Sequence, residues 1–320
     1  MKLTIGIRDF NDETLEFAAQ YGVSHLKIDL VDFLDADGRG PIRTDDLLHA
    51  KKKINKAGLD IGVALLPQPP QSLHWSIRLG SKERERDIEN VIRVIEALGT
   101  AAIPVAEYVF NLAAVYGSMR LPSGRGNSVV RHFDYADVIN DPPKPGFEAE
   151  EEEVWERIAW FLERVIPVAE TAGVKMACHP DDPPVPKLLG ETRILGTFDG
   201  LKRLVELVPS ESNGLNFCQG TVAEMGENVV EMIRYFGSRG AIHHIHFRNI
   251  KRSLPSFDES FIDDGDVDMW DALRTYKEVG YSGTIMPDHV PDGVGGVHAG
   301  RAYALGYMRA MMKALDVLEE

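Results

Sequence analysis

The sequence predicts an α/β fold in which eight parallel strands close into a (β/α)8 barrel. Eight short runs of β-type residues recur along the 320 residues, and amphipathic helical stretches separate them. Strands that alternate with helices in this way form a parallel sheet, and eight repeats are enough to close it. The alternative is an open, doubly wound sheet, but no G-x-G-x-x-G follows the first run to support nucleotide binding there. One barrel domain is therefore expected over residues 1–320.

The predicted strands and helices alternate along the chain. The strands are LTIGI (3–7), HLKIDL (25–30), DIGVALL (60–66), AAIPVAEYVF (101–110), VKMAC (174–178), GLNFC (214–218), AIHHIHF (241–247) and GTIMP (283–287). The helices are TLEFAAQYG (14–22), DLLHAKKKINKAG (46–58), RDIENVIRVIEALG (86–99), EEEEVWERIAWFLERVIPVAETAG (150–173), GLKRLVELV (200–208), NVVEMIRYFGSRG (228–240) and MWDALRTYKEVG (269–280). Several helices end in glycine, as helix C-termini often do.

One connection is long. Residues 111–147 separate the fourth strand from the next helix, and loops of this length in compact domains are typically lids or binding loops. Arg120, Arg125 and Arg131 are concentrated in this loop of an otherwise acidic chain. We therefore expect the loop after strand four to contribute to a binding site.

The composition excludes several classes of function. Hydrophobic residues make up 44% and charged residues 27%, as in an ordinary globular protein, and the net charge of −15 would repel nucleic acid. Cys178 and Cys218 are too few for a disulfide scaffold and favour a reducing compartment. The N-terminus lacks the apolar core of a signal peptide, and no apolar run approaches the roughly 20 residues that span a bilayer. We expect a cytoplasmic protein with no membrane or nucleic-acid partner.

The last four predicted strands each end in a residue that can bind a metal ion. The C-terminal ends of barrel strands converge on one mouth, where active sites lie. The fifth strand ends at His179, the sixth at Cys218, the seventh at His246 and the eighth at Asp288, with His289 next to it. A thiolate, two neutral imidazoles and a carboxylate would neutralise a divalent cation, and the soft thiolate alone would favour zinc or iron.

Each of these residues also has a purely structural interpretation. A single cysteine at a strand end is usually a small buried hydrophobic residue. His243 and His244 are expected to bind backbone carbonyls or to lie on the outer face of their strand. A metal site is favoured because four separate strands would place such residues at the same end.

Several segments resemble, in order, the signature of the mannonate dehydratase family. They are HPDDPP (179–184), FCQGT (217–221), HFRN (246–249), GDVDM (265–269) and PDH (287–289). The resemblance is strongest from about residue 150 to 290 and continues more weakly upstream. It implies a metal-dependent TIM barrel, a hydro-lyase of hexuronate catabolism that dehydrates D-mannonate to 2-keto-3-deoxy-D-gluconate, usually with Mn2+.

The resemblance also assigns roles. The family's metal ligands fall on His179, Cys218, His246 and Asp288, and its proton-transfer histidine falls on His289. The cofactor implied is a divalent metal ion, Mn2+ before Fe2+, Co2+ or Zn2+. The partner implied is a small-molecule sugar acid, and a homodimer or higher homo-oligomer is consistent with barrels of this kind.

The sequence departs from the family at three places. Residues 7–10 (IRDF) stand where the family has an aromatic W-Y-G motif, and Met286 stands where the family has arginine before P-D-H. The loop 290–303 is short and has no clear equivalent of the family's catalytic tyrosine, for which His298 or Tyr303 would have to substitute. These differences lie where substrate would be recognised.

The expected reaction begins with removal of the proton next to the substrate carboxylate. His289 is predicted to be this base, or the acid that protonates the leaving C3 hydroxyl. Arg248, two positions past His246 on the same face, is predicted to bind the carboxylate as a catalytic residue. The residues expected to bind substrate are Arg8, Asp181, Asp182, Arg120, Arg125 and Asn249.

Two other functions remain open from the sequence. A metal-dependent sugar or keto-sugar isomerase or epimerase would start with the same proton abstraction on the same barrel. A non-catalytic sensor of sugar acids would keep the barrel and lose the reaction, although all four candidate ligands are retained.

Overall fold

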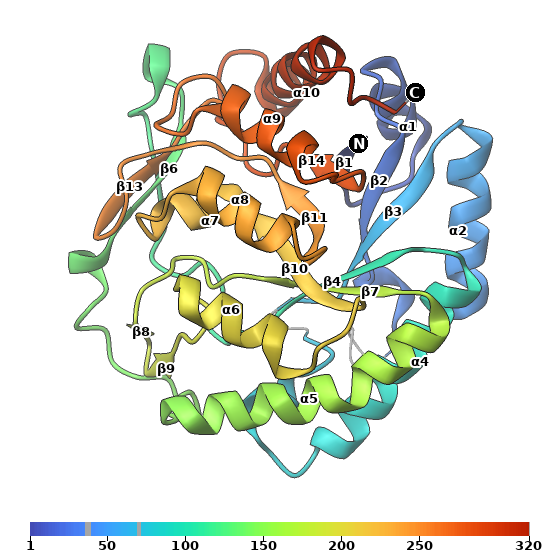
Figure 1. The fold of residues 1–320 in the computed structure, drawn as a ribbon, viewed down its shortest axis with the longest axis vertical. Coiled ribbons are helices and arrows are strands. Elements are labelled where there is room, and N and C mark those ends of the chain that lie inside the picture. The colour runs from blue at the N-terminus through green and yellow to red at the C-terminus, as the bar shows by residue number, and fades with distance from the viewer. Residues whose placement is uncertain (36–39, 69–71, 320) are drawn as a thin grey trace.

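The computed structural model describes residues 1–35, 40–68 and 72–319, and its centre is a closed barrel of eight parallel strands (Figure 1). Around the barrel the order is β1-β2-β3-β4-β7-β10-β11-β14, and β14 closes onto β1. These strands are β1 (Lys2–Ile7), β2 (His25–Asp29), β3 (Asp60–Leu65), β4 (Val105–Val109), β7 (Lys175–His179), β10 (Asn213–Cys218), β11 (Ile242–His246) and β14 (Thr284–Met286). The predicted (β/α)8 TIM barrel is confirmed, although the fourth strand begins later than expected.

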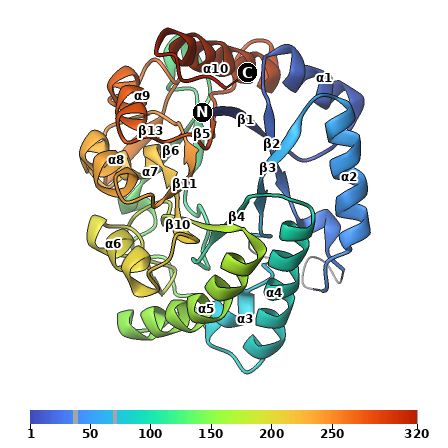
Figure 2. The same cartoon turned by 45° about the vertical axis from the view of Figure 1, so that its right-hand side comes forward.

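Helices surround the strands, as Figure 2 shows. The longer ones are α1 (Asp12–Gln20), α2 (Thr44–Lys56), α4 (Arg84–Thr100), α5 (Glu151–Ala172), α6 (Phe198–Leu207), α8 (Val229–Gly237), α9 (Met269–Glu278) and α10 (Gly296–Ala314). Two short helices, α3 (Trp75–Leu79) and α7 (Gln219–Glu224), lie in connections between longer elements. No helix in the described part of the chain is long and apolar enough to cross a membrane.

The prediction of a loop over residues 290–303 is wrong from residue 296 onward, because α10 begins there. Glycines at 293, 295, 296 and 300 obscured the start of this helix, because glycine is a poor helix former. Further along, apolar residues recur at helical spacing and are buried: Ala304, Leu305, Met308, Met311 and Met312. The loop after β14 is therefore shorter than the sequence suggested.

The acidic run before α5 has the local role that its position suggests. Glu150 is the N-cap, and a capping box joins it reciprocally to Glu153. The remaining acids lie in the first turn, where negative charge is favoured by the helix dipole. Gly173 ends the helix with a φ of 69°, a left-handed conformation that glycine adopts without strain.

The long connection after β4 is an ordered part of the barrel mouth. It forms β5 (Met119–Leu121) and β6 (Val130–Asp134), which pair in a four-stranded antiparallel sheet of order β12-β13-β6-β5 with β12 (Ile250–Lys251) and β13 (Ser256–Glu259). We call these four strands the mouth sheet. The rings of Phe133 and Phe257 pack within it with centroids 5.4 Å apart. The loops that follow the fourth and seventh barrel strands are thereby fixed to each other (Figure 1).

A smaller hairpin and a single bridge complete the mouth. The hairpin joins β8 (Lys187–Leu188) to β9 (Glu191–Thr192) after the fifth barrel strand. Val129 pairs with Asp292, which ties the mouth sheet to the loop after β14. Side chains at the C-terminal ends of the strands are therefore enclosed by connected loops.

Candidate metal and active site

Three of the four predicted metal ligands meet at the barrel mouth. His179, Cys218 and His246 are the last residues of three consecutive barrel strands, β7, β10 and β11, and all three are largely buried. One ligand atom from each lies within 4.8 Å of the other two. Parallel strands in register deliver their terminal side chains to one place, which is the arrangement that the sequence predicted.

Asp288 lies beside this group. It follows β14 by two residues, and its Oδ2 is 3.5 Å from Nδ1 of His246 and 3.5 Å from Nε2 of His289. The Nδ1 atom of His246 is buried and has no hydrogen-bond partner among the described residues. A free imidazole nitrogen facing a carboxylate is suited to share a cation with it.

The charges of the group fit a divalent cation. Burial alone would raise the pKa of Cys218, but Arg248 and His179 lower it well below its ordinary value. Burial would likewise lower the pKa of His179, yet the Cys218 thiolate next to it and Glu107 raise it to about 9. Without metal, a proton on His179 balances the thiolate, and a cation could take the place of that proton.

His289 stands at the edge of the same group. Its Nδ1 is 2.5 Å from Oε1 of Glu259, a residue of the mouth sheet that the sequence analysis did not identify. Burial would lower the pKa of His289, but Asp288 and Glu259 outweigh burial and raise it. Because Glu259 holds Nδ1, Nε2 is the nitrogen left to exchange a proton with a ligand.

Two further charged residues, Lys27 and Glu107, lie next to His246 inside the barrel, and the sequence did not reveal either of them. The Nζ atom of Lys27 on β2 lies 2.7 Å from Oε1 of Glu107 on β4 and 3.1 Å from Nε2 of His246. The other oxygen of Glu107 is 3.7 Å from the same Nε2. The amide nitrogen of Asn216 is also 3.1 Å from Nε2 of His246, so Lys27 and Asn216 hold this nitrogen and leave Nδ1 toward Asp288, while Glu107 places a negative charge nearby.

Glu107 belongs to a second group that could hold a metal ion, together with His244 and His246. The Lys27 ammonium contacts two members of this group, which disfavours a second cation there. As expected, His243 and His244 bond to backbone carbonyls, with Nδ1 3.0 Å from the oxygen of Met176 and 3.1 Å from that of Thr284, respectively.

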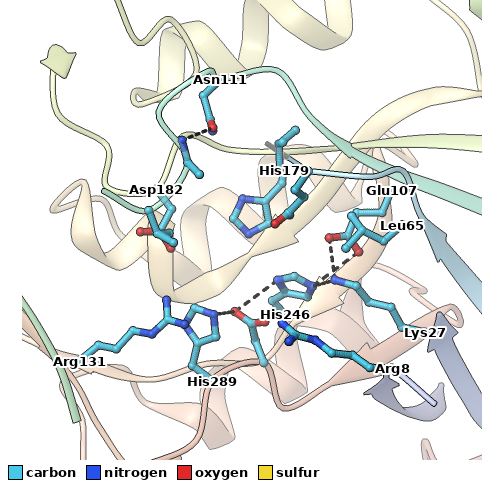
Figure 3. A pocket seen from close by; sticks show the side chains of 15 residues that line it. Arg8, Lys27, Leu65, Glu107, Asn111, Arg131, His179, Asp182, His246 and His289 are labelled. Atoms are coloured by element: carbon cyan, nitrogen blue, oxygen red, sulfur yellow. Dashed lines mark hydrogen bonds and ion pairs between the residues drawn. The ribbon is translucent and has the colours of Figure 1, made fainter. Parts of the chain in front are cut away.

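A cavity of about 320 Å³ opens onto these side chains, and Figure 3 shows how they surround it. His179 at the end of β7, His246 at the end of β11, and Asp288 and His289 after β14 line it. Its other polar lining residues are Arg8, Lys27, Gln68, Glu107, Asn111, Arg131 and Asp182. Arg8 and Asp182 thus lie where the sequence predicted substrate contacts, and Arg131 joins them.

Arg248 does not face the cavity, although it was predicted to bind the substrate carboxylate. Its side chain is 2% exposed, and its guanidinium lies 2.9 Å from Asp182, 3.4 Å from the sulfur of Cys218 and 2.8 Å from Glu259. The strand β11 ends at His246, so the alternation of side chains along the strand does not extend to residue 248. Arg248 lies behind the mouth and holds its acidic groups.

Asp181 and Asn249 also point away from the cavity. Both are buried, and the Asp181 carboxylate accepts a hydrogen bond from the backbone N–H of Leu195 at 2.8 Å. The Asn249 amide donates to the carbonyls of Ile262 and Val267 at 3.1 Å each. These two side chains hold loops together and leave no group free for substrate.

The two arginines predicted from the long loop differ in position. Arg120 is exposed and pairs with Asp292, next to a second, smaller cavity that also adjoins His289. Arg125 pairs with Asp263 at 2.8 Å and stacks on the ring of Phe261, away from both cavities.

The two residues considered as substitutes for the family tyrosine lie on α10. His298 packs against Phe17 with ring centroids 4.8 Å apart, and Tyr303 is 42% exposed beside Phe261. Neither lines the cavity of about 320 Å³. Among the residues that line this cavity, His289, Lys27 and Glu107 are the polar groups that contact the candidate ligands.

Known proteins share both sequence and architecture with this chain. Residues 147–320 match the model of the family described as D-mannonate dehydratase (UxuA). A mannonate dehydratase of Thermotoga maritima is 33% identical over 288 residues, covering 77% of this chain and 77% of its own. The crystal structure of a mannonate dehydratase from Streptococcus suis covers 100% of this chain and 96% of its own, with a TM-score of 0.88 and 27% identity. A 3-keto-D-glucoside 4-epimerase from E. coli, at a TM-score of 0.65 and 13% identity over 97% of this chain and 99% of its own, shares the fold alone. By sequence and by structure, the chain belongs to the mannonate dehydratase family of hydro-lyases.

Proposed function

We propose that the protein removes water from a sugar acid, converting D-mannonate to 2-keto-3-deoxy-D-gluconate, with a divalent metal ion held at the barrel mouth. The observation that carries the proposal is the convergence of His179, Cys218 and His246 within 4.8 Å of one another, next to a cavity that also contains His289. The cavity of about 320 Å³ is of the size that small-molecule sites have. The choice of reaction is supported by the similar proteins that are named mannonate dehydratase.

His179, Cys218, His246 and Asp288 would hold the metal ion. Three of them supply a thiolate and two imidazoles. The fourth is the Asp288 carboxylate, whose Oδ2 lies 3.5 Å from Nδ1 of His246. When bound, a divalent cation supplies charge that stabilises the negative oxygens developing as the bond between C2 and its hydrogen breaks. We propose Mn2+ on family grounds, while the thiolate would also accept Fe2+, Co2+ or Zn2+.

His289 would transfer a proton at Nε2. The reaction takes a proton from C2 and delivers one to the C3 hydroxyl, which leaves as water, and the resulting enol tautomerises to the 2-keto-3-deoxy acid. Glu259 fixes Nδ1 of His289 at 2.5 Å and orients the ring toward the cavity. This arrangement serves either the base at C2 or the acid at C3.

Arg248 would act through the groups that it holds. Its contacts with Cys218, Asp182 and Glu259 position the thiolate and the partner of His289. Lysine has one nitrogen and cannot make these contacts together. We expect Arg248→Lys to weaken metal binding about tenfold or more, because charged hydrogen bonds are lost, and unchanged metal affinity would contradict this role.

A direct assay tests the function. The purified protein, loaded in turn with Mn2+, Fe2+, Co2+ or Zn2+, is incubated with D-mannonate and with a panel of other hexonates and pentonates, and formation of a 2-keto-3-deoxy acid is measured. We expect product from D-mannonate that depends on the metal ion and disappears in Cys218→Ser. Failure to form product from any of these acids with any of the four metal ions would contradict the proposal.

A further inference from the structure

A second cavity of about 220 Å³ adjoins the one described above. The two share Arg131, Asp288 and His289, so both meet at the proton-transfer histidine. The second cavity is walled by the mouth sheet, by the loop after β14 and by Arg301 and Val297 of α10. It is therefore a side compartment of the reacting centre.

Charged side chains of both signs line this compartment: Arg120, Arg131, Arg301 and His289, with Glu259, Asp288 and Asp292. Arg120 pairs with Asp292, but neither Arg131 nor Arg301 forms an ion pair with a carboxylate in the part of the chain that the structure describes. Glu259, which lines the cavity with Arg131, is already bonded to Arg248 and His289. Two guanidinium groups are thus left with unused donors, in a chain whose net charge is −15.

The environment of Arg301 is unfavourable for a cation in the unliganded protein. Its side chain is partly buried, and burial together with the nearby Arg8 lowers its pKa from the ordinary value. Holding a guanidinium partly out of water beside a like charge costs free energy that a bound anion would offset. Figure 3 shows Arg131 extending toward His289, a residue that lines both cavities.

We propose that the second cavity is an oxyanion-binding subsite in which Arg131 and Arg301 take a carboxylate or phosphate group. Guanidinium groups bind such groups through paired hydrogen bonds, and a compartment of about 220 Å³ suits one acidic group and its neighbouring atoms. A ligand that reacts at His289 could extend its far end into this compartment. The subsite would then favour sugar acids that carry a second acidic group, such as a hexarate or a phosphorylated hexonate.

The subsite is tested first without any substrate. Inorganic sulfate is titrated calorimetrically into the metal-loaded protein and into Arg131→Gln, Arg301→Gln and Arg301→Lys, each checked for native circular dichroism. We expect Arg131→Gln and Arg301→Gln each to weaken sulfate binding about tenfold or more, because a charged hydrogen bond is lost, and Arg301→Lys to recover part of it. The control is Arg239→Gln, since Arg239 is an exposed arginine that stacks on Tyr235 outside both cavities.

A kinetic experiment tests whether the anion is part of the substrate. It rests on the proposed dehydratase function. The ratio of kcat/KM for D-mannarate to that for D-mannonate is compared between the wild-type protein and Arg301→Gln. A wild-type preference for the diacid that falls about tenfold in the variant would assign the subsite to the substrate's second acid. Sulfate binding that depends on both arginines without such a preference would assign the subsite to a phosphate group or a free anion instead of a second carboxylate.

The sulfate titration also separates this inference from the proposed function, because it needs no turnover. Sulfate that does not bind the wild-type protein, or that binds all variants equally, would overturn the subsite even if D-mannonate is dehydrated. If Arg301→Gln does not fold, Arg131→Gln carries the same test, since Arg131 lines the cavity from β6 and Arg301 from α10.

Discussion

Both ends of the barrel contain buried histidines, but the histidine pKa is lowered at one end and raised at the other. His243 and His246 lie three residues apart on β11, yet His243 lines a cavity of about 470 Å³ at the N-terminal end, whereas His246 faces the mouth. At the N-terminal end, burial lowers the pKa of His243 to about 4. At the mouth, the pKa of His179 is raised to about 9 against the effect of burial.

The difference lies in the partners. His243 donates to the carbonyl of Met176, and its cavity is also lined by Lys2 and Lys175, which disfavour further positive charge. His179 faces the Cys218 thiolate, and the remaining mouth histidines face carboxylates. For these two residues, burial keeps His243 neutral because no buried anion faces it, whereas the buried thiolate raises the pKa of His179.

The largest expected contrast between the ends is catalytic. His289→Ala should lower kcat by about 10²–10⁴-fold, because it removes the proton-transfer group while leaving the metal ligands in place. His243→Ala, the matched change at the other end, should leave kcat unchanged and should lower the melting temperature. The measurement is kcat with D-mannonate together with metal content, and equal losses of kcat in the two variants would contradict the contrast.

A smaller effect, on metal affinity, is expected from Glu107, which contacts the candidate ligand His246 from inside the barrel. Glu107→Gln should weaken metal binding by about 10–100-fold, since it removes the buried negative charge that lies 3.7 Å from His246 and pairs with Lys27. The control is Glu211→Gln, an exposed acid near the N-terminal end whose side chain is 98% exposed. Metal affinity is measured by competition with a chelator, and an unchanged affinity in Glu107→Gln would show that Glu107 serves only to neutralise Lys27.

The smallest effect concerns stability and pH at the N-terminal end. The pKa of His243 is about 4 in the folded protein and 6.5 for an unperturbed histidine, so the unfolded chain binds a proton that the folded protein does not. The free energy of unfolding should therefore fall as pH drops below the unfolded value and should stop falling through this group near the folded one. Between about pH 6.5 and about pH 5, this residue should account for roughly 1.5 kcal/mol.

Urea unfolding of the wild-type protein and His243→Gln near these two pH values measures that contribution. The wild-type protein should lose more stability than the variant over the interval. Equal losses would mean that His243 is not held neutral by burial.

The sequence predicted the ligand end of the site well, because it depends on strand ends alone. His179, Cys218 and His246 each terminate a short apolar run, and the parallel barrel brings such positions together without further information. Asp288 was predicted in the same way, and it lies next to the group. The fold class followed from the same repeats.

Residues within strands were harder to predict, because their direction depends on the closed barrel. In HLKID, Leu26 and Ile28 are fully buried, so Lys27 points to the opposite face, which in a barrel is the interior. A lysine between apolar residues would ordinarily indicate a solvent-exposed face. Glu107 left a clearer signal, since it is a single acid within the apolar run AAIPVAEYVF.

Residues beyond strand ends were predicted least well. Arg248 and Asn249 follow β11, where the chain leaves the sheet, and both turn into the protein instead of the cavity. Glu259 contacts His289 only because β13 pairs with β6 across more than 120 residues of sequence. No local pattern in the sequence predicts that these two strands pair.

The central claim is that the mouth holds one divalent ion with Cys218 as a ligand. The most direct measurement is the absorption spectrum of the cobalt-substituted protein, because a thiolate bound to Co2+ gives a sulfur-to-metal charge-transfer band. Cys178, the other cysteine, is also buried and provides the matched control. We predict the band in the wild-type protein and in Cys178→Ser, and its loss in Cys218→Ser; a band that persists in Cys218→Ser would contradict the claim.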